Sequence, residues 1–322
     1  MNASLPPDWE RALLEKIAVR SLDEQRRARH WSTLIRLLWL TLFFLVFSAV
    51  MGWVGPSTRE PLHSGRHTAL VDLNGVIGLQ DEASADRIVD ALKSAFADKR
   101  TQGVVVRINS PGGSPVQAGV INDEIRRLRQ QHPDIPLYAV VQDLCASGGY
   151  YVAVAADRIY VDKASLLGSI GVTMGGFGFT GAMQKLGVER RAYTAGDNKD
   201  FLDPFAPENP AQRAHVQKML NEIHAQFKQV VRDGRGERLV ESPEIFSGLV
   251  WTGERAIELG LADGLGSLDS VARDVIQAEL IIDFTPTEDY LHALTRRLGA
   301  SAAGGVLQSL AGWQARAPSS LR

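Results

Sequence analysis

The sequence predicts an α/β protein with a mainly parallel sheet, and two observations carry this prediction. Short apolar or β-branched runs typical of buried strands occur at residues 70–79, 104–108, 137–141 and 158–161. Segments with the apolar periodicity of amphipathic helices lie among them, at residues 85–97 and 116–130. Strands that alternate with helices indicate βαβ units, in which neighbouring strands run parallel.

The chain beyond Gly187 follows a looser pattern. A polar loop leads to a predicted long helix at residues 211–232, for which Asn209 and Pro210 supply a cap and a first-turn residue. A shorter helix is predicted at residues 252–259, and Gly260 is suited to end it. Residues 283–322 carry spaced leucines among small residues, a pattern compatible with a weakly amphipathic helix, with core packing or with disorder.

Length and composition exclude several classes of protein. The 322 residues suffice for one large or two modest domains with a buried core. Charged residues make up 22% of the chain and the net charge is -2, which argues against a disordered chain and against a nucleic-acid partner. Cys145 is the single cysteine, so the chain has neither an intramolecular disulfide nor a zinc site of clustered thiolates.

One uncharged apolar stretch, residues 37–58, is long enough to cross a bilayer as a helix. Trp39 and Trp53 stand near its ends, where amphipathic rings favour the headgroup region. A buried soluble helix and a cleaved signal peptide are the alternatives, but no small-residue cleavage site follows the stretch. We therefore predict a membrane anchor at residues 34–57, preceded by a cytoplasmic N-terminal segment at residues 1–33.

The charges that flank this anchor predict its orientation. More arginines precede it than follow it, and cytoplasmic flanks carry the excess of positive charge. The arginines close before the uncharged stretch 37–58 are Arg20, Arg26, Arg27, Arg29 and Arg36, and those close after it are Arg59 and Arg66. The N-terminus is therefore predicted in the cytoplasm and the main domain, residues 58–282, on the other side of a bacterial inner membrane, in the periplasm or outside the cell.

Two turns after predicted strands have the composition of a catalytic site. Residues 108–115, INSPGGSP, bring two adjacent glycines whose N–H groups can bind an anion or an oxyanion. Ser147, in CASGGYY, stands where a strand gives way to a helix, which favours developing negative charge. Each turn alone is more often structural, but open α/β sheets place their sites where such strand ends meet.

A serine nucleophile needs a base, and no histidine lies between Pro133 and Ala214. Lys199, in the loop GDNKDFLDPF, is the available candidate, because an amine buried among apolar side chains loses its proton more easily. An exposed, solvated lysine is the alternative. We interpret Cys145 as a buried core residue, and His215 and His224 as surface residues of the long helix.

A glycine-rich segment, residues 175–181, contains a G-x-G-x-x-G pattern. We reject a dinucleotide site there because no clear βαβ context surrounds it, and we expect a loop that walls the site. The histidine spacing also argues against a zinc hydrolase, since no His-Glu-x-x-His motif occurs.

Five motifs, in this order, resemble the signal peptide peptidase A family of membrane-anchored serine peptidases in its short, single-domain form. They are NSPGG (109–113), CASGGYY (145–151), LGSIGV (167–172), AGDNKDFLDPF (195–205) and GERAIELGLADGLG (253–266). The resemblance covers about residues 68–271 and implies an α/β fold like that of Clp protease and crotonase. It also implies degradation of cleaved signal peptides and similar apolar peptides, with neither cofactor nor metal.

The resemblance assigns a role to each site residue. Ser147 matches the nucleophile, Lys199 the general base, and Ser169 the hydroxyl that positions the lysine amine. Gly113 and Gly148 match the N–H donors of the oxyanion hole. Family members form rings or domes, sometimes with sites completed between protomers, so we expect a homo-oligomer.

Three alternatives share parts of this pattern. A Clp-type Ser/His/Asp protease with a broader quality-control role needs a histidine after its serine, and no histidine lies between Ser147 and His215. A crotonase-type acyl-CoA enzyme has no need of an anchor or of Lys199. A catalytically idle membrane scaffold would be free to lose the serine and the lysine that this chain retains.

Overall fold

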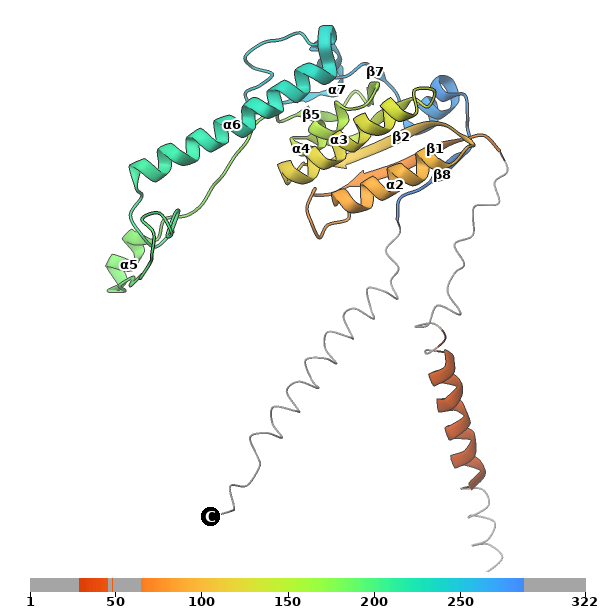
Figure 1. The fold of residues 1–322 in the computed structure, drawn as a ribbon, viewed down its shortest axis with the longest axis horizontal. Helices are drawn as coiled ribbons and strands as arrows, with labels where there is room; N and C mark the ends of the chain where they lie inside the picture. The colour runs from red at the N-terminus through yellow and green to blue at the C-terminus, as the bar shows by residue number, and fades with distance from the viewer. Residues whose placement is uncertain (1–28, 46–47, 49–64, 287–322) are drawn as a thin grey trace, which may run out of the picture. The chain divides into compact units, whose positions relative to one another are not determined.

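The structure, a computed structural model, describes residues 29–45, 48 and 65–286, which belong to two compact units, residues 1–64 and 65–322 (Figure 1). In the first unit, residues 29–45 are helical, and the apolar side chains along 34–45 are exposed. No helix of the described residues combines the length and the hydropathy needed to cross a membrane. Residues 46, 47 and 49–57 of the predicted anchor, and residues 287–322 of the predicted tail, lie outside the described residues.

The second unit is built from alternating strands and helices, followed by shorter elements. In chain order they are β1 (His67–Asn74), α2 (Ala85–Ala97), β2 (Thr101–Ser110), α3 (Pro115–Gln131), β3 (Leu137–Ala146), α4 (Gly148–Ala153), β4 (Arg158–Val161), β5 (Leu166–Gly168), α5 (Thr180–Leu186), α6 (Pro210–Arg235), the 3-10 turn η1 (Gly236–Arg238), β6 (Val250–Thr252), α7 (Gly253–Glu258), β7 (Gly264–Leu265), α8 (Leu268–Ser270), the π-helical turn η2 (Val271–Ile276) and β8 (Ile281–Asp283).

The strands form one eight-stranded sheet in the order β6-β5-β3-β2-β1-β8, with β4 paired to β3 and β7 paired to β4. All pairs are parallel except β5 with β6. The predicted α/β class with a mainly parallel sheet is therefore confirmed, and this architecture fits the Clp-protease-like fold that the resemblance implied. The first half of β3 pairs with β4 and its last residues pair with β5, so β5 lies at the carboxyl end of β3.

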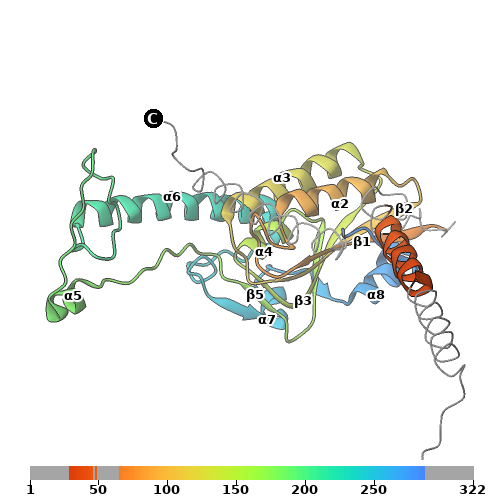
Figure 2. The same cartoon turned by 90° about the horizontal axis from the view of Figure 1, so that it is seen from below.

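Side chains of both sheet faces are buried, as expected for parallel strands covered by helices. Val104 and Val106 of β2 belong to the large core under α2, α3, α4 and the C-terminal half of α6. Val105, between them, belongs to a smaller core with Val140 and Val271, on the opposite face beside α8 and η2 (Figure 2). The alternation follows from the two-residue period of a strand.

The predicted elements agree closely with the observed ones, with one informative exception. The helix predicted at residues 85–97 and the strand at 158–161 have the observed bounds, and α6 begins at Pro210 behind an Asn209 cap that accepts a hydrogen bond from Ala211 N at 2.9 Å. The strand predicted at 70–79 instead ends at Asn74. Gly75, with φ +86°, turns the chain there, and Ile77 then bridges to Gly113.

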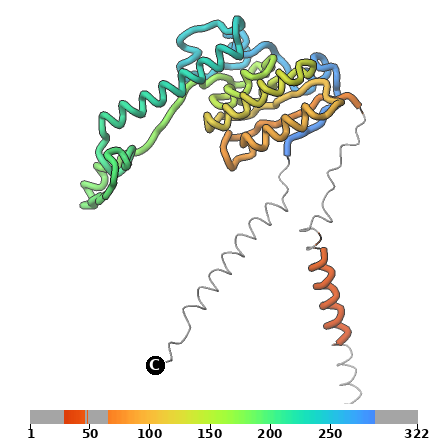
Figure 3. Tube along the Cα trace, viewed as in Figure 1, coloured from red at the N-terminus to blue at the C-terminus, as the bar shows by residue number. Residues whose placement is uncertain are grey.

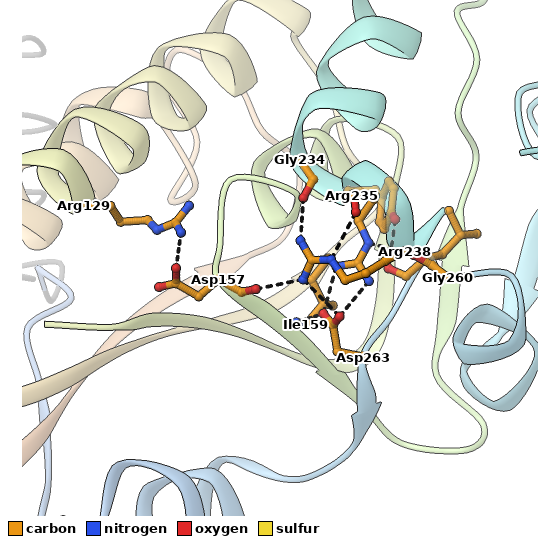
Figure 4. Close-up of polar contacts among 10 residues, drawn as sticks. Arg129, Asp157, Ile159, Gly234, Arg235, Arg238, Gly260 and Asp263 are labelled. Atoms are coloured by element: carbon orange, nitrogen blue, oxygen red, sulfur yellow. Dashed lines mark hydrogen bonds and ion pairs between the residues drawn. The ribbon is translucent and has the colours of Figure 1, made fainter. Parts of the chain in front are cut away.

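The C-terminal half of α6 is fixed to the sheet by a buried ion pair. The Arg235 guanidinium, 1% exposed, donates to both carboxylate oxygens of Asp263, at 2.8 and 2.9 Å (Figure 4). Arg238 also bonds Asp263, at 3.1 Å, and Ile159 N of β4 donates to the same carboxylate at 2.7 Å. Burial raises the pKa of Asp263, but these bonds and charges outweigh it, so the net pKa is lowered.

The N-terminal half of α6 has no such anchorage. The buried residues of this helix are Phe227, Val231 and Arg235, all in its C-terminal half, and α5 has no buried residue. The chain between β5 and the middle of α6, residues 172–222, forms a projection that we call the arm; the Cα trace shows it extending away from the sheet (Figures 1 and 3).

Candidate active site

Three parallel strands bring the predicted site residues to one edge of the sheet. β2 ends at Ser110, before Gly112 and Gly113; β3 ends at Ala146, before Ser147; and β5 ends at Gly168, before Ser169. Because β2, β3 and β5 are parallel neighbours, their carboxyl ends meet at the same edge. Open α/β sheets place ligands at this edge, where strand ends leave room for loops.

Ser147 sits in a strained strand-to-helix turn, half-buried. Its φ of +51° and ψ of -119° are unfavourable for a residue with a side chain, and such strain costs about 1–3 kcal/mol. The turn is held by hydrogen bonds from Ser147 N to Gly168 O at 2.8 Å and from Tyr151 N to Ser147 O at 2.9 Å. A strained residue that its surroundings hold in place is typical of functional sites.

The glycine turn lies directly beside Ser147. A Cβ atom at Gly112 would come within 2.6 Å of Gly148 N and 2.8 Å of Ser147 Cβ, and φ there is +95°. Gly148 also lies close to this turn, since a Cβ atom at Gly148 would lie 3.2 Å from Gly113 N. Hydrogen bonds from Ile77 N to Gly112 O and from Ser114 N to Ile77 O hold the turn without using the Gly113 N–H. The N–H groups of Gly113 and Gly148 are thus close neighbours, as an oxyanion hole requires.

Ser169 completes the group on the β5 side. It is half-buried, has a φ of +51°, and its N donates to Leu249 O at 2.7 Å. Ser147, Gly113, Gly148 and Ser169 all line one cavity of about 560 Å³. Ala118, Tyr151, Val172 and Phe227 contribute apolar surface to the same cavity. The cavity can therefore hold an apolar side chain beside the serine hydroxyl.

Lys199 lies apart from these four residues, on the arm. Its side chain is exposed, and the neighbouring Asn198 accepts a hydrogen bond from Gln212 Nε2 at 3.3 Å, in the first turn of α6. Ile223, the nearest cavity-lining residue of α6, comes 11 residues later, which corresponds to about 16 Å along a helix. Within one chain, the structure brings together four of the five predicted residues and leaves Lys199 outside the cavity.

The remaining sequence-predicted features have clear positions. Cys145 is buried, as interpreted from the sequence, and burial raises the pKa of its thiol, which makes it a poor rival nucleophile. The glycine-rich segment is part of the arm, and at Gly175, Gly176 and Gly178 no atom lies within 4 Å of the Cβ position, so no close backbone approach explains these glycines.

The interpretation of His215 and His224 as surface residues is confirmed for His215 and wrong for His224. His215 is exposed, whereas His224 is half-buried and its Nε2 lies 3.1 Å from Ile170 O, beside Ser169. The sequence contained a signal for this: residues three and seven positions apart share one face of a helix, and His224 stands in that relation to the buried Phe227 and Val231.

Comparison with known proteins assigns this site to a family. Residues 129–280, which contain Ser147, Ser169 and Lys199, match Peptidase family S49. A "Putative protease" of Methanocaldococcus jannaschii is 30% identical over 241 residues, with 73% of this chain and 76% of that protein covered. The chain belongs to peptidase family S49. A second relative, "Putative signal peptide peptidase SppA" of Enterococcus faecium, is 29% identical over 232 residues, 67% of each chain. The family match and these protease-named relatives support a serine peptidase.

Longer proteins also contain a region like this S49 chain. Two Brucella proteins named "Na(+)/H(+) antiporter NhaA" are 43% identical over 213 residues, which is 65% of this chain. This chain spans only 29% of the length of those relatives. Their name describes the whole of a longer protein, so it assigns no transport activity to this chain.

Proposed function

We propose that this S49 protein is a membrane-anchored serine endopeptidase that degrades cleaved signal peptides and similar apolar peptides with a Ser147/Lys199 dyad. The observation that carries the proposal is the strained Ser147 beside the neighbouring N–H groups of Gly113 and Gly148, in a cavity with apolar walls. The name of the Enterococcus relative supports the substrate class.

The catalytic steps follow from these positions. Ser147 Oγ attacks the carbonyl carbon of the scissile bond while its proton passes to the neutral amine of Lys199, and the two glycine N–H groups stabilise the oxyanion. When the C–N bond breaks, the lysine ammonium returns that proton to the leaving amine. Water then attacks the acyl-enzyme, with Lys199 again accepting a proton, and the serine hydroxyl is restored.

The separation of Lys199 from the cavity supports a homo-oligomer in which the arm of one copy supplies the lysine to the Ser147 of a neighbour. Apolar side chains on the arm are unusually exposed: Phe177 at 81%, Leu186 at 77% and Tyr193 at 94%. Exposed apolar surface of this kind marks interaction sites. Ser169 would then orient the incoming amine, and burial among arm aromatics such as Phe205 would favour its neutral form.

The anchor accounts for access to the substrate. The apolar side chains of the helix at residues 29–45 are exposed, with Leu38 at 70%, as a lipid-facing segment requires. Together with the uncharged stretch up to residue 58, they support a single span at residues 34–57 with the peptidase domain, residues 58–282, in the periplasm or outside the cell. A signal peptide remnant in the same membrane would meet the enzyme at high effective concentration.

The test is hydrolysis of apolar, signal-like peptides by the full chain in detergent, with chelator present. Wild type should cleave, whereas Ser147→Ala and Lys199→Ala should fall to background at unchanged oligomeric state. Ser94→Ala and Lys93→Ala, which change exposed residues of α2, are the matched controls. Activity retained by either site variant would refute the dyad, and no cleavage by wild type would favour the idle scaffold.

A further inference from the structure

His224 connects α6 to the segment that carries Ser169. Its Nε2 lies 3.1 Å from the carbonyl oxygen of Ile170, a fully buried residue. A carbonyl oxygen only accepts hydrogen bonds, so the imidazole must donate, which requires the tautomer with hydrogen on Nε2. The histidine lies between the exposed half of α6 and its buried half, next to Ile223, which lines the cavity.

The segment that receives this bond is tied to the nucleophile on its other side. Gly168 O accepts from Ser147 N at 2.8 Å, and Ser169 N donates to Leu249 O at 2.7 Å. Gly171 N donates back to Ser169 O at 2.9 Å, which closes a tight turn around Ile170. The position of Ser169 is thus set by its bond to Leu249, directly before β6, and by the bond between Gly168 and the Ser147 turn, with the His224 bond one residue further on.

This turn needs external support because its backbone is strained. Ser169 adopts a φ of +51°, and a residue with a side chain keeps such a conformation only where its surroundings impose it. The next residues pack tightly, since the Cβ position of Gly171 lies 3.1 Å from Gly248 Cα. Without the imidazole, the Ile170 carbonyl would be left without this donor beside the cavity, and the strained turn could relax.

We propose that His224 is a positioning residue of the peptidase: its Nε2–H holds the Ile170 carbonyl and thereby keeps Ser169 at the cavity wall, oriented toward the incoming lysine amine. This role rests on the proposed Ser147/Lys199 dyad. His224 is not within the reacting group itself. Misplacing a group that orients reacting atoms by about 1 Å can lower the rate by about 100-fold.

The test compares His224→Ala with His224→Gln, whose amide nitrogen can replace the Nε2 donor, in the full chain at matched oligomeric state. We expect kcat to fall about 10- to 100-fold in His224→Ala with KM within about twofold, and to recover substantially in His224→Gln. Gln229→Ala, which changes an exposed residue in the C-terminal half of the same helix, outside the arm, should match wild type. A kcat for His224→Ala within about twofold of wild type, or no recovery with glutamine, would overturn the proposal.

A second measurement separates this proposal from the proposed function. Hydrogen exchange, followed by mass spectrometry on the full chain, should accelerate in the peptide covering residues 166–173 in His224→Ala but not in Gln229→Ala or His224→Gln. If wild type cleaves nothing, the dyad fails while the exchange result still tests the positioning role. Unchanged exchange at residues 166–173 in His224→Ala would refute that role even in an active enzyme.

Discussion

The edge of the sheet and the arm differ in how their predicted site residues are placed within a single chain. At the edge, backbone hydrogen bonds hold the strained Ser147 and the glycine turn, so the proposed nucleophile and oxyanion hole lie together within one copy. The arm instead presents Lys199 and large apolar side chains to solvent. Gln212, which bonds the neighbouring Asn198, lies about 16 Å along α6 from Ile223 at the cavity. The difference teaches that folding of one chain brings Ser147 and the glycine turn together, whereas the proposed Ser147/Lys199 dyad requires the arm of a neighbouring copy.

The largest effect should come from mixing two inactive variants. Ser147→Ala retains the lysine and Lys199→Ala retains the serine, so if the site is shared between copies, co-assembled oligomers regain complete sites. In a random equal mixture, about one quarter of the sites would be intact, because each site draws one residue from each of two symmetry-related copies. Peptide hydrolysis measures this recovery, from background to about 25% of wild type.

A mixture that stays at background, although both variants co-assemble, would show that one chain supplies both residues. The arm would then have to fold back onto its own cavity. Mixing Ser147→Ala with a Ser147→Ala/Lys199→Ala double variant is the negative control, because no complete site can form from it.

The buried anchorage of α6 should matter far more to stability than the arm half of the same helix. Arg235→Met leaves the Asp263 carboxylate without its main partner, and breaking a buried pair lowers the free energy of unfolding by about 3–5 kcal/mol. Arg213→Met, at an arm position whose side chain is 74% exposed, should change it by less than about 0.5 kcal/mol. Urea denaturation measures both. Equal effects would contradict the division of α6 into an anchored and a free half.

Relief of the backbone strain at Ser147 should change the free energy of unfolding by less than the Arg235 substitution does, and in the opposite direction. Glycine accepts a positive φ freely, so Ser147→Gly should raise the free energy of unfolding by about 1 kcal/mol while abolishing hydrolysis. Ser147→Ala loses the hydroxyl but keeps the strain, so it should be equally inactive without the gain. Thermal denaturation of both variants distinguishes them, and equal melting temperatures would argue against stored strain.

The smallest effect concerns acid stability, away from the cavity. The Arg100 guanidinium, through its side-chain hydrogen bond, lowers the pKa of Asp98 from 3.8 to about 2. A carboxylate with a lowered folded-state pKa stabilises the protein above its unfolded pKa, and this contribution disappears as pH falls through the folded value. Asp98→Asn should therefore be less stable than wild type at pH 6, and the difference should shrink between about pH 4 and pH 2.

Asp90→Asn, at an exposed position of α2, is the control for this comparison. Denaturation midpoints at several pH values provide the measurement. A difference between Asp98→Asn and wild type that does not change with pH would contradict the assigned role of Arg100.

Local sequence patterns predict the α/β class and the longer elements of the fold. Period-two and helical apolar patterns depend on local geometry, so β1 to β4, the long helices and the Asn209 cap were predictable, whereas the short strands β5 to β8 were not predicted. Parallel strand ends meet at one edge, so the glycine turn at 108–115 and Ser147 are predicted to lie together, whereas Ser169 and the roles of Gly113 and Gly148 come from the family resemblance. The order of the motifs likewise indicates the signal peptide peptidase A family, and comparison with known proteins assigns the chain to peptidase family S49.

Only the tertiary structure decided where the arm and His224 lie. The path of residues 172–222 depends on long-range packing that apolar periodicity does not encode, so Lys199, near in motif order, proved distant in space. The sequence predicts His224 at the surface because polar residues of a helix are usually exposed. Its partial burial depends on the Ile170 carbonyl, which the tertiary structure brings beside it. The periodicity of a helix determines which residues share one face, and the tertiary contacts determine what that face packs against.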